Sequence, residues 1–253
     1  MFTVLKKSKG SFQVEVCTEK GVREENEDAV LVLKEKHLYA VADGMGGHDG
    51  GGECSSEIVR LLKKAVLEQE QEKHSPFSLH HEVQFLKTSV EKINEELWKK
   101  SAKEPKLRRA GSTLSMIRLF PETRQFAIAH VGDTRVVRYR ATTRNEELLR
   151  EFPLTKDHNY EVDGRVHKNL LTNCMGPAQR VDTFTVDSSY GTYKKGDLFV
   201  ISSDGLHDYA EMLPSIRAYF HVKDATLKEL REDLLKECKD RSEDNYSFIL
   251  IQA

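Results

Sequence analysis

The sequence predicts a mixed α+β fold built as a single domain over residues 1–253. Blocks of strand-like segments are separated by pairs of helix-like segments, and the strict strand–helix alternation of a parallel doubly wound sheet is absent. The chain has 253 residues, of which 38% are hydrophobic, and this composition suits one domain with a sizeable core.

The first third of the chain predicts three strands followed by two helices. Apolar and polar residues alternate over 12–18, as they do in a half-buried strand. Two more strand-like segments are separated by a short polar turn, which predicts a hairpin. After a glycine cluster, apolar residues recur at the spacing of an amphipathic helix. These segments are strands 29–34 and 38–43 with their turn at 35–37, the glycine cluster 44–52, and helices around 58–65 and 83–97.

The remaining two thirds predict a second block of strands, a second pair of helices and a last strand. Segment 102–110 is basic, contains Pro105 and predicts a loop. Period-two alternation follows it, whereas residues 142–196 show a mixed pattern. The expected strands are 113–120, 125–131, 135–141, 198–202 and 246–251, and the expected helices are 206–220 and 225–240.

The composition excludes several classes of protein. Lys and Arg number 39 against 41 for Asp and Glu, so the chain lacks the basic character of a nucleic-acid-binding protein. No run approaches the roughly 18 apolar residues of a membrane span, and the first ten residues predict no cleaved secretory signal. The cysteines are scattered without a Cys-x-x-Cys pair, which favours a reduced, cytoplasmic protein. They are Cys17, Cys54, Cys174 and Cys238.

Five aspartates share one local context, in which an apolar strand meets a turn. Taken singly, each is typical of a turn or a helix N-cap. Asp43 and Asp204, however, share a rarer pattern, namely an aliphatic strand, then Asp-Gly, then a predicted helix. Carboxylate oxygens are the hard ligands that Mg²⁺ and Mn²⁺ prefer, and a following glycine leaves its carbonyl free to face a cation. The other three aspartates are Asp28, Asp133 and Asp244.

The glycine cluster also has a nucleotide-binding interpretation. A strand, then Gly44-Met-Gly46, then a helix is the setting of a dinucleotide-binding loop. The sixth position of that motif is Asp49 here, and a second predicted helix follows where a parallel strand is needed. The sequence also contains no GxxxxGK[ST] motif. Nucleotide binding is therefore the weaker hypothesis.

Seven segments, in one order along the chain, resemble those of the metal-dependent protein phosphatases. This family comprises the type 2C serine/threonine phosphatases, and the resemblance is to its compact bacterial form. It implies a central antiparallel β-sandwich flanked on each face by a pair of helices, a four-layer αββα arrangement. The segments are Gly21-Val-Arg-Glu-Glu-Asn-Glu-Asp28, Val41-Ala-Asp-Gly-Met-Gly-Gly-His48, Gly111-Ser-Thr113, Val131-Gly-Asp-Thr-Arg135, Leu154-Thr-Lys-Asp-His158, Gly196-Asp-Leu-Phe-Val-Ile-Ser-Ser-Asp-Gly-Leu206 and Asp244-Asn245.

The resemblance also implies a site for two Mn²⁺ or Mg²⁺ ions, with a possible weaker third. Its residues are Asp43 bridging the two ions, the Gly44 carbonyl on the second ion, Asp204 and Asp244 on the first ion, Asp133 on the third, Glu27 and Asp28 reaching the metals through water, and Arg23 gripping the substrate phosphate.

Such a site implies hydrolysis of phosphoserine and phosphothreonine on proteins by metal-activated water, in opposition to a bacterial serine/threonine kinase. We expect a cytoplasmic monomer whose partners are phosphorylated proteins and that kinase, with neither nucleic acid binding nor membrane insertion. The alternative is a pseudophosphatase, which binds phosphoproteins or another partner without turnover. The complete acidic set argues against this alternative, because a decayed site usually loses ligands.

Two features depart from the family pattern. Met45 stands where some members carry a histidine assigned as general acid, and His48, three residues on, is expected outside that role. The flap region around 159–169 is shorter than the insert that bacterial members usually carry, which puts substrate gating in question. His158, just before this region, is expected to form structural hydrogen bonds.

Overall fold

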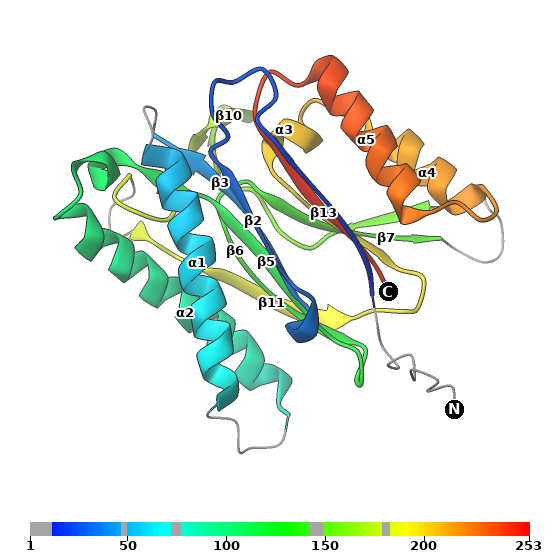
Figure 1. The fold of residues 1–253 in the computed structure, drawn as a ribbon, viewed down its shortest axis with the longest axis horizontal. Coiled ribbons are helices and arrows are strands. Elements are labelled where there is room, and N and C mark those ends of the chain that lie inside the picture. The colour runs from blue at the N-terminus through cyan, green and yellow to red at the C-terminus, as the bar shows by residue number, and fades with distance from the viewer. Residues whose placement is uncertain (1–11, 47–49, 72–76, 142–148, 179–182) are drawn as a thin grey trace, which may run out of the picture.

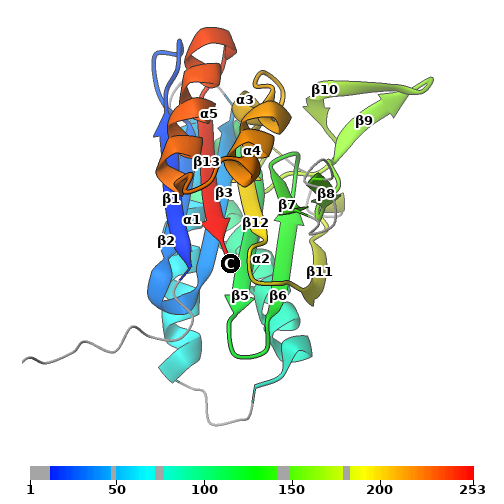
Figure 2. The same cartoon turned by 90° about the vertical axis from the view of Figure 1, so that its right-hand side faces the viewer.

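The computed structural model describes residues 12–46, 50–71, 77–141, 149–178 and 183–253. Two antiparallel sheets lie face to face, and a pair of helices covers the outer face of each sheet (Figure 1, Figure 2). The predicted four-layer sandwich is therefore confirmed. Among these residues, no helix combines the length and the apolar character that crossing a bilayer requires.

The first sheet joins the two ends of the chain. Its first and last strands pair antiparallel, with Gln13 opposite Gln252 and Glu19 opposite Tyr246. Their neighbours come from the middle and the second half of the sequence, so this sheet forms only when distant segments meet. In spatial order its strands are β1 (Gln13–Glu19), β13 (Tyr246–Gln252), β12 (Leu198–Ser202), β7 (Arg135–Ala141) and β8 (Leu149–Pro153).

The second sheet is built largely from local hairpins. The predicted hairpin is confirmed, because Leu33 lies opposite Leu38 across the one-turn 3₁₀ helix η1 (Lys34–Lys36). In spatial order the strands are β11 (Asp187–Thr192), β6 (Gln125–Val131), β5 (Leu114–Phe120), β3 (Leu38–Met45) and β2 (Asp28–Leu33), with β4 (Gly111–Ser112) pairing to the end of β3.

The helices form two pairs, one for each sheet. Helix α5 (Leu227–Arg241) begins with a capping box, in which Thr226 and Glu229 bond each other's backbone N–H groups. The short helix α3 follows β12 directly and precedes the second pair. The pair on the second sheet is α1 (Gly50–Gln71) and α2 (Leu79–Ser101), the pair on the first sheet is α4 (Met212–His221) and α5 (Leu227–Arg241), and the short helices are α3 (Asp204–His207) and η2 (Pro105–Arg109).

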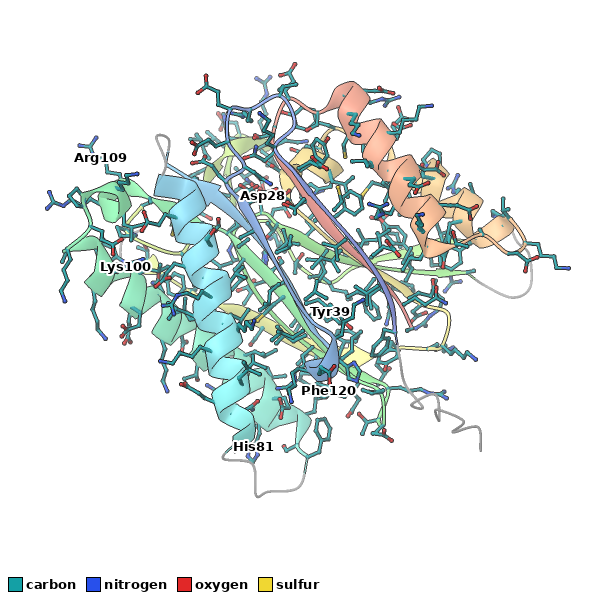
Figure 3. All side chains as sticks on the ribbon, viewed as in Figure 1. Asp28, Tyr39, His81, Lys100, Arg109 and Phe120 are labelled. Atoms are coloured by element: carbon teal, nitrogen blue, oxygen red, sulfur yellow. The ribbon has the colours of Figure 1, made fainter. Side chains whose placement is uncertain are left out.

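Three apolar layers hold the four structural layers together. In strand β3 alternate side chains point into two different apolar layers, as the period of two requires. Its Leu38, Ala40 and Ala42 pack under α1 and α2, whereas Tyr39 and Val41 point between the sheets, where Tyr39 is labelled in Figure 3. A third layer lies between the first sheet and α4–α5. Because β3 is buried on both faces, it is apolar throughout until Asp43.

Two predicted elements are wrong. The helix expected over 206–220 is two helices, α3 and α4, separated at 208–211. Pro214 explains the break, because proline fits the first turn of α4 but cannot continue a helix that runs in from α3. The loop expected over 102–110 contains the 3₁₀ helix η2, whose Leu107 is buried in the core under α1 and α2.

The segment expected to form the flap is a β-hairpin. Strands β9 (Asn159–Val162) and β10 (Arg165–Leu171) pair only with each other and project from the body of the molecule (Figure 2). Their side chains are mostly exposed, including Tyr160, Val162 and Val166. The hairpin is therefore supported mainly at its base, next to the site described below.

Candidate active site

A cleft of about 650 Å³ gathers most of the predicted site residues at one end of the sandwich. Seven of the eight line it, and the eighth, Asp28, is buried behind them at the start of β2, where Figure 3 labels it. Glu24, Glu25, Lys168, Asp208 and Tyr209 are further lining residues that the sequence did not single out. The seven predicted lining residues are Arg23, Glu27, Asp43, Gly44, Asp133, Asp204 and Asp244.

The two sheets bring these residues together because the strands that carry them end at the same edge. Asp28 opens β2 and lies directly opposite Asp43 near the end of β3. Asp204 follows β12, and Asp244 precedes β13, which is the antiparallel neighbour of β12. Asp133 lies in the turn between β6 and β7, which belong to different sheets. The turn-flanked aspartates of the sequence are thus neighbours in space.

Glycines are required beside two of these aspartates for a packing reason. A Cβ on Gly44 would collide with the backbone of Gly51 at the start of α1, and one on Gly205 would collide with the carbonyl of Asn245. Both collisions involve backbone atoms, which cannot turn aside. The Asp-Gly pattern therefore lets α1 and the segment before β13 approach the cleft closely.

Neighbouring side chains hold the carboxylates in place. The hydroxyl of Ser203 donates to Oδ2 of Asp28 at 2.8 Å. The backbone of Asp43 is bonded twice to Thr113, through Asp43 N–H to Oγ1 at 3.1 Å and Thr113 N–H to the Asp43 carbonyl at 2.9 Å. Thr113 is almost fully buried, and its two bonds fix the backbone position of Asp43.

Arg23 lies at the rim of the cleft. Its Nη2 donates to Oδ2 of Asp244 at 2.8 Å, and its Nε donates to the carbonyl of Glu243 at 3.1 Å. The Arg23 side chain is 55% exposed. Its guanidinium is thus positioned over the acidic cleft and accessible to a ligand that enters from solvent.

The same end of the sandwich is braced by Asn245. Its Oδ1 accepts the N–H of Glu27 at 2.9 Å, and its Nδ2 donates to the carbonyls of Lys20 and Glu25. Asn245 therefore fixes the loop that carries Arg23 and Glu27. In the sequence this role is signalled by the Asp244-Asn245 pair. Before the fold is known, however, Asn245 is simply a residue typical of turns.

Burial and mutual repulsion make the cleft carboxyls reluctant to ionise. Burial, followed by repulsion from Asp28 and Asp204, raises the pKa of Asp43 well above its ordinary value. Burial raises the pKa of Asp28 to about 7, and burial with repulsion from Asp204 raises the pKa of Asp133 to about 7. A bound cation would reverse this balance, because it favours the ionised carboxylate.

The donor chemistry of the cleft fits a hard divalent cation. Among the residues that the structure describes, Oδ1 of Asp28 and Oδ1 of Asp204 are buried without a hydrogen-bond partner. Buried carboxylate oxygens are expected to have partners, and oxygen-only sets suit Mg²⁺ and Mn²⁺. Within that same part of the chain, no three His, Cys, Asp or Glu side chains are already grouped to hold an ion.

Comparison with known proteins agrees with this architecture. The family model for protein phosphatase 2C matches residues 21–238, which is most of the chain. The chain belongs to the protein phosphatase 2C family. The predicted family is thereby confirmed. The predicted enzyme class, a serine/threonine phosphatase, is confirmed with it.

Several bacterial proteins are similar to this chain over nearly its whole length. The serine/threonine phosphatase stp of Listeria monocytogenes is 29% identical over 252 residues, covering 94% of both chains. PppA of Pseudomonas aeruginosa, a regulatory component of its T6SS, superposes with a TM-score of 0.74 at 26% identity, covering 96% of this chain and 97% of its own. Stp1 of Staphylococcus aureus has the same fold, with a TM-score of 0.77, 24% identity and coverage of 96% and 95%.

The expectations for His48, His158 and Met45 at this phosphatase-family site have different outcomes. His48 lies outside the described residues, so the expectation that it is not the general acid stays a prediction. His158 does form structural hydrogen bonds, since its Nδ1 accepts the N–H of Gly132 at 3.1 Å. Met45 lines the cleft beside Gly44 and offers no proton to a leaving group.

Mn²⁺ is expected to raise the melting temperature more at pH 8 than at pH 5. A carboxyl with a raised folded-state pKa contributes stability below its unfolded pKa and loses it as the pH rises through the folded value. For Asp28 and Asp133 that loss is completed above about pH 7, and a cation then relieves it. At hundredfold excess over Kd, binding adds roughly 2.7 kcal/mol, or several degrees for a chain of this size.

The measurement is a set of thermal melts with Mn²⁺ and with EDTA across this pH range. Buried His130 titrates in the opposite direction, because burial lowers its pKa to about 4. The difference between the two melts at each pH cancels that contribution. A Mn²⁺-induced shift that is equal at pH 5 and pH 8 would contradict a carboxylate metal site.

Proposed function

We propose that this chain is a Mn²⁺- or Mg²⁺-dependent phosphatase that hydrolyses phosphoserine and phosphothreonine on proteins. One observation carries the proposal: buried, mutually repelling carboxylates from both sheets share one open cleft with an exposed arginine. The carboxylates suit cations, and the arginine suits the phosphate of a substrate. Membership of the protein phosphatase 2C family supports the same reaction.

In this proposal two ions would be held by Asp43, which would be common to both, by the Gly44 carbonyl for one of them, and by Asp204 and Asp244 for the other. When bound, the ions supply charge neutralisation for the phosphate and lower the pKa of water that attacks it. Glu27 and Asp28 support the ions from outside this set. The chain itself provides what the reaction needs around the ions, which is a rigid backbone at Asp43 and a cleft open to a protein substrate.

Arg23 is proposed to bind the phosphate of the substrate. A guanidinium presents two parallel N–H donors that match two phosphate oxygens, an arrangement that lysine cannot reproduce. Arg23 shares its Nη2 with Asp244, so substrate and Asp244 compete for one donor. Cations on Asp244 would favour transfer of the guanidinium to the phosphate.

The biological setting is proposed on more general grounds. The similarity to bacterial serine/threonine phosphatases supports a role against a bacterial serine/threonine kinase. The four cysteines are all free and buried, which suits a reduced, cytoplasmic compartment. We propose that the protein acts there as a monomer.

The deciding experiment is hydrolysis of a phosphothreonine peptide with Mn²⁺, with and without EDTA. We expect turnover with Mn²⁺, complete loss in EDTA, and recovery by excess Mn²⁺ better than by Zn²⁺, because every ligand is oxygen. Turnover that resists EDTA would contradict the metal mechanism. Binding of the phosphopeptide without any turnover would identify a pseudophosphatase instead.

Replacing Arg23 by alanine is expected to raise KM for the phosphopeptide by roughly 10- to 100-fold, the loss of a charge-assisted bidentate contact of about 1.5–3 kcal/mol. Mn²⁺ affinity should survive, because Arg23 contacts Asp244 without being a ligand. Steady-state kinetics and calorimetric Mn²⁺ titration measure the two effects separately. Arg241→Ala is the matched control, since Arg241 is an exposed, ion-paired arginine on α5. A collapse of Mn²⁺ affinity in Arg23→Ala would refute the phosphate role.

A further inference from the structure

Residues 154–159, called here the clamp segment, run alongside the turn that carries Asp133. Almost every residue of the clamp segment forms a hydrogen bond with a residue in the range 130–136. The contacts are Leu154 N–H to the Val136 carbonyl at 2.9 Å, Val136 N–H to Thr155 Oγ1 at 3.0 Å, His130 Nε2 to the Lys156 carbonyl at 2.9 Å, Arg135 Nη2 to Asp157 Oδ2 at 2.6 Å, and Asn159 Nδ2 to Asp133 Oδ2 at 3.2 Å.

His158 is the member of the clamp segment that binds the turn itself. Its backbone N–H donates to the Gly132 carbonyl at 2.8 Å, and its Nδ1 accepts the Gly132 N–H at 3.1 Å. Gly132 has φ +98°, a conformation that side chains other than glycine rarely adopt, and a Cβ there would collide with Thr113. Two bonds from His158 therefore hold an unusual backbone conformation one residue before Asp133.

The tautomer of His158 is set by its other neighbours. Because Nδ1 accepts from Gly132, the ring proton lies on Nε2, which faces Oδ2 of Asp187 at 3.3 Å. Nδ2 of Asn173 also lies 3.1 Å from Nδ1, as a second donor to the same acceptor. The Asp187 carboxylate thereby orients the His158 ring through the proton on Nε2.

We propose that His158 is a positioning residue: its Nδ1 holds the Gly132 amide and thereby fixes the turn that presents Asp133 to the cleft. The inference rests on the proposed function and on the third, weaker cation at Asp133 that the family resemblance implies. It adds a residue that does not line the cleft. A purely structural role would instead stabilise the fold without changing what Asp133 binds.

The side chain of Asp133 depends on the same segment. Asn159, the next residue after His158, donates one bond to Oδ2 of Asp133 and another to the carbonyl of Lys168 in β10. Loss of the bond that the Gly132 N–H donates to His158 Nδ1 would therefore loosen the backbone before Asp133 and the segment that carries the partner of its carboxylate. We expect a weaker third cation site as the result, with the other two ions unaffected.

Three substitutions of His158 separate its acceptor from its donor. In His158→Asn the amide oxygen stands close to the place of Nδ1, so the bond from Gly132 can persist. In His158→Gln the amide stands nearer the place of Nε2, so the contact with Asp187 can persist while the acceptor is lost. His158→Leu removes both. We therefore expect His158→Asn to keep the function of the wild type and His158→Gln to lose it.

The readouts are calorimetric Mn²⁺ titration, the Mn²⁺ concentration for half-maximal activity, and kcat and KM on a phosphopeptide. For His158→Gln and His158→Leu we expect the Mn²⁺ requirement to rise about 10- to 100-fold, the range typical of residues that orient metal ligands. The two tighter Mn²⁺ sites and KM should stay unchanged, and His158→Asn should remain near wild type. The opposite order, or equal Mn²⁺ requirements in all three variants, would overturn the proposal.

A matched control isolates the effect of losing a buried acceptor. Asn94 on α2 accepts the N–H of Gly176 at 2.7 Å, and Gly176, like Gly132, has a positive φ of 87°. Asn94→Leu should lower the melting temperature and leave the Mn²⁺ requirement unchanged. If Asn94→Leu raises that requirement as much as His158→Leu does, the effect is one of general stability and the proposal is wrong.

The variant Asp133→Ala distinguishes failure of this inference from failure of the proposed function. If Asp133→Ala loses the weak Mn²⁺ site while His158→Leu keeps it, the positioning role alone is wrong. If Asp133→Ala keeps the weak site, the assignment of Asp133 is wrong, and the inference falls with it. If both lose the weak site and His158→Asn keeps it, both hold.

Discussion

Replacing Asp43 by asparagine is expected to abolish turnover and, at the same time, to stabilise the protein in EDTA. Asp43 is the proposed ligand common to both ions, so kcat should fall at least ~10³-fold, equivalent to roughly 4 kcal/mol of barrier. Asparagine has the shape of a protonated aspartate, and burial together with repulsion from Asp28 and Asp204 already raises the pKa of Asp43 well above its ordinary value. The substitution therefore preserves the packing and removes the charge.

The stability effect of Asp43→Asn has a predictable sign and pH dependence. A carboxyl with a raised folded-state pKa costs stability increasingly as the pH rises, and the variant lacks that cost. Its melting temperature in EDTA should exceed that of the wild type by roughly 2–4 °C for each kcal/mol of repulsion removed, and by more at pH 8 than at pH 5. Such opposition between stability and activity is typical of functional sites.

The measurement for Asp43→Asn combines phosphopeptide kinetics at saturating Mn²⁺ with melts in EDTA. Asp240→Asn is the matched control, because Asp240 is an exposed carboxylate on α5 away from the cleft. It should change neither kcat nor the pH dependence of the melt. Near-normal kcat in Asp43→Asn would remove Asp43 from the metal site, whatever its effect on stability.

Replacing Asp133 by alanine is expected to lower kcat by about 10- to 100-fold while two tight Mn²⁺ sites remain. A third cation at Asp133 would neutralise charge on the phosphate, so its loss should affect turnover more than binding of the other ions. The side chain is almost buried, and its pKa is raised to about 7 by burial and then by Asp204. The melting temperature should change little, because repulsion is lost together with the bond from Asn159.

The alternative role of Asp133 is to shape the turn between β6 and β7. In the structure the unusual backbone conformation is that of Gly132, and His158 holds it, so the turn does not rely on the carboxylate. A turn role predicts lost stability with nearly normal kcat in the folded fraction. Near-wild-type kcat of Asp133→Ala at saturating Mn²⁺ would exclude Asp133 from the chemistry.

The sequence located the aspartates of the cleft but missed part of its lining, including Lys168, Asp208 and Tyr209. The period of two located the strands, and the aspartates at their ends are the residues that line the site or lie directly behind it. The paired helices and the β2–β3 hairpin also followed from local patterns, because hydrophobic periodicity and turn chemistry act over a few residues. Local patterns did not reveal the break before α4 at Pro214, because the apolar pattern is continuous across it.

Only the tertiary structure decided which residues support that site. Ser203 bonds Asp28 across 175 positions of sequence, and Asn245 bonds Glu27 across 218. Ser203 and Asn245 lie beside β12 and β13 of the first sheet, whereas Asp28 and Glu27 lie at the start of β2 in the second sheet, so these partners meet only when the two sheets pack together. Local propensity contains no information about such contacts.

The raised pKa values of the site carboxyls and the role of His158 also depend on the packing of distant segments. An aspartate in a turn has an ordinary pKa until packing removes water and brings other carboxylates close, as happens at Asp43. The sequence predicts only that His158 forms structural hydrogen bonds, and its partner Gly132, 26 positions earlier in the chain, is revealed by the fold. Residue types are encoded locally, whereas burial, charge coupling and hydrogen-bond partners arise from the packing of distant segments.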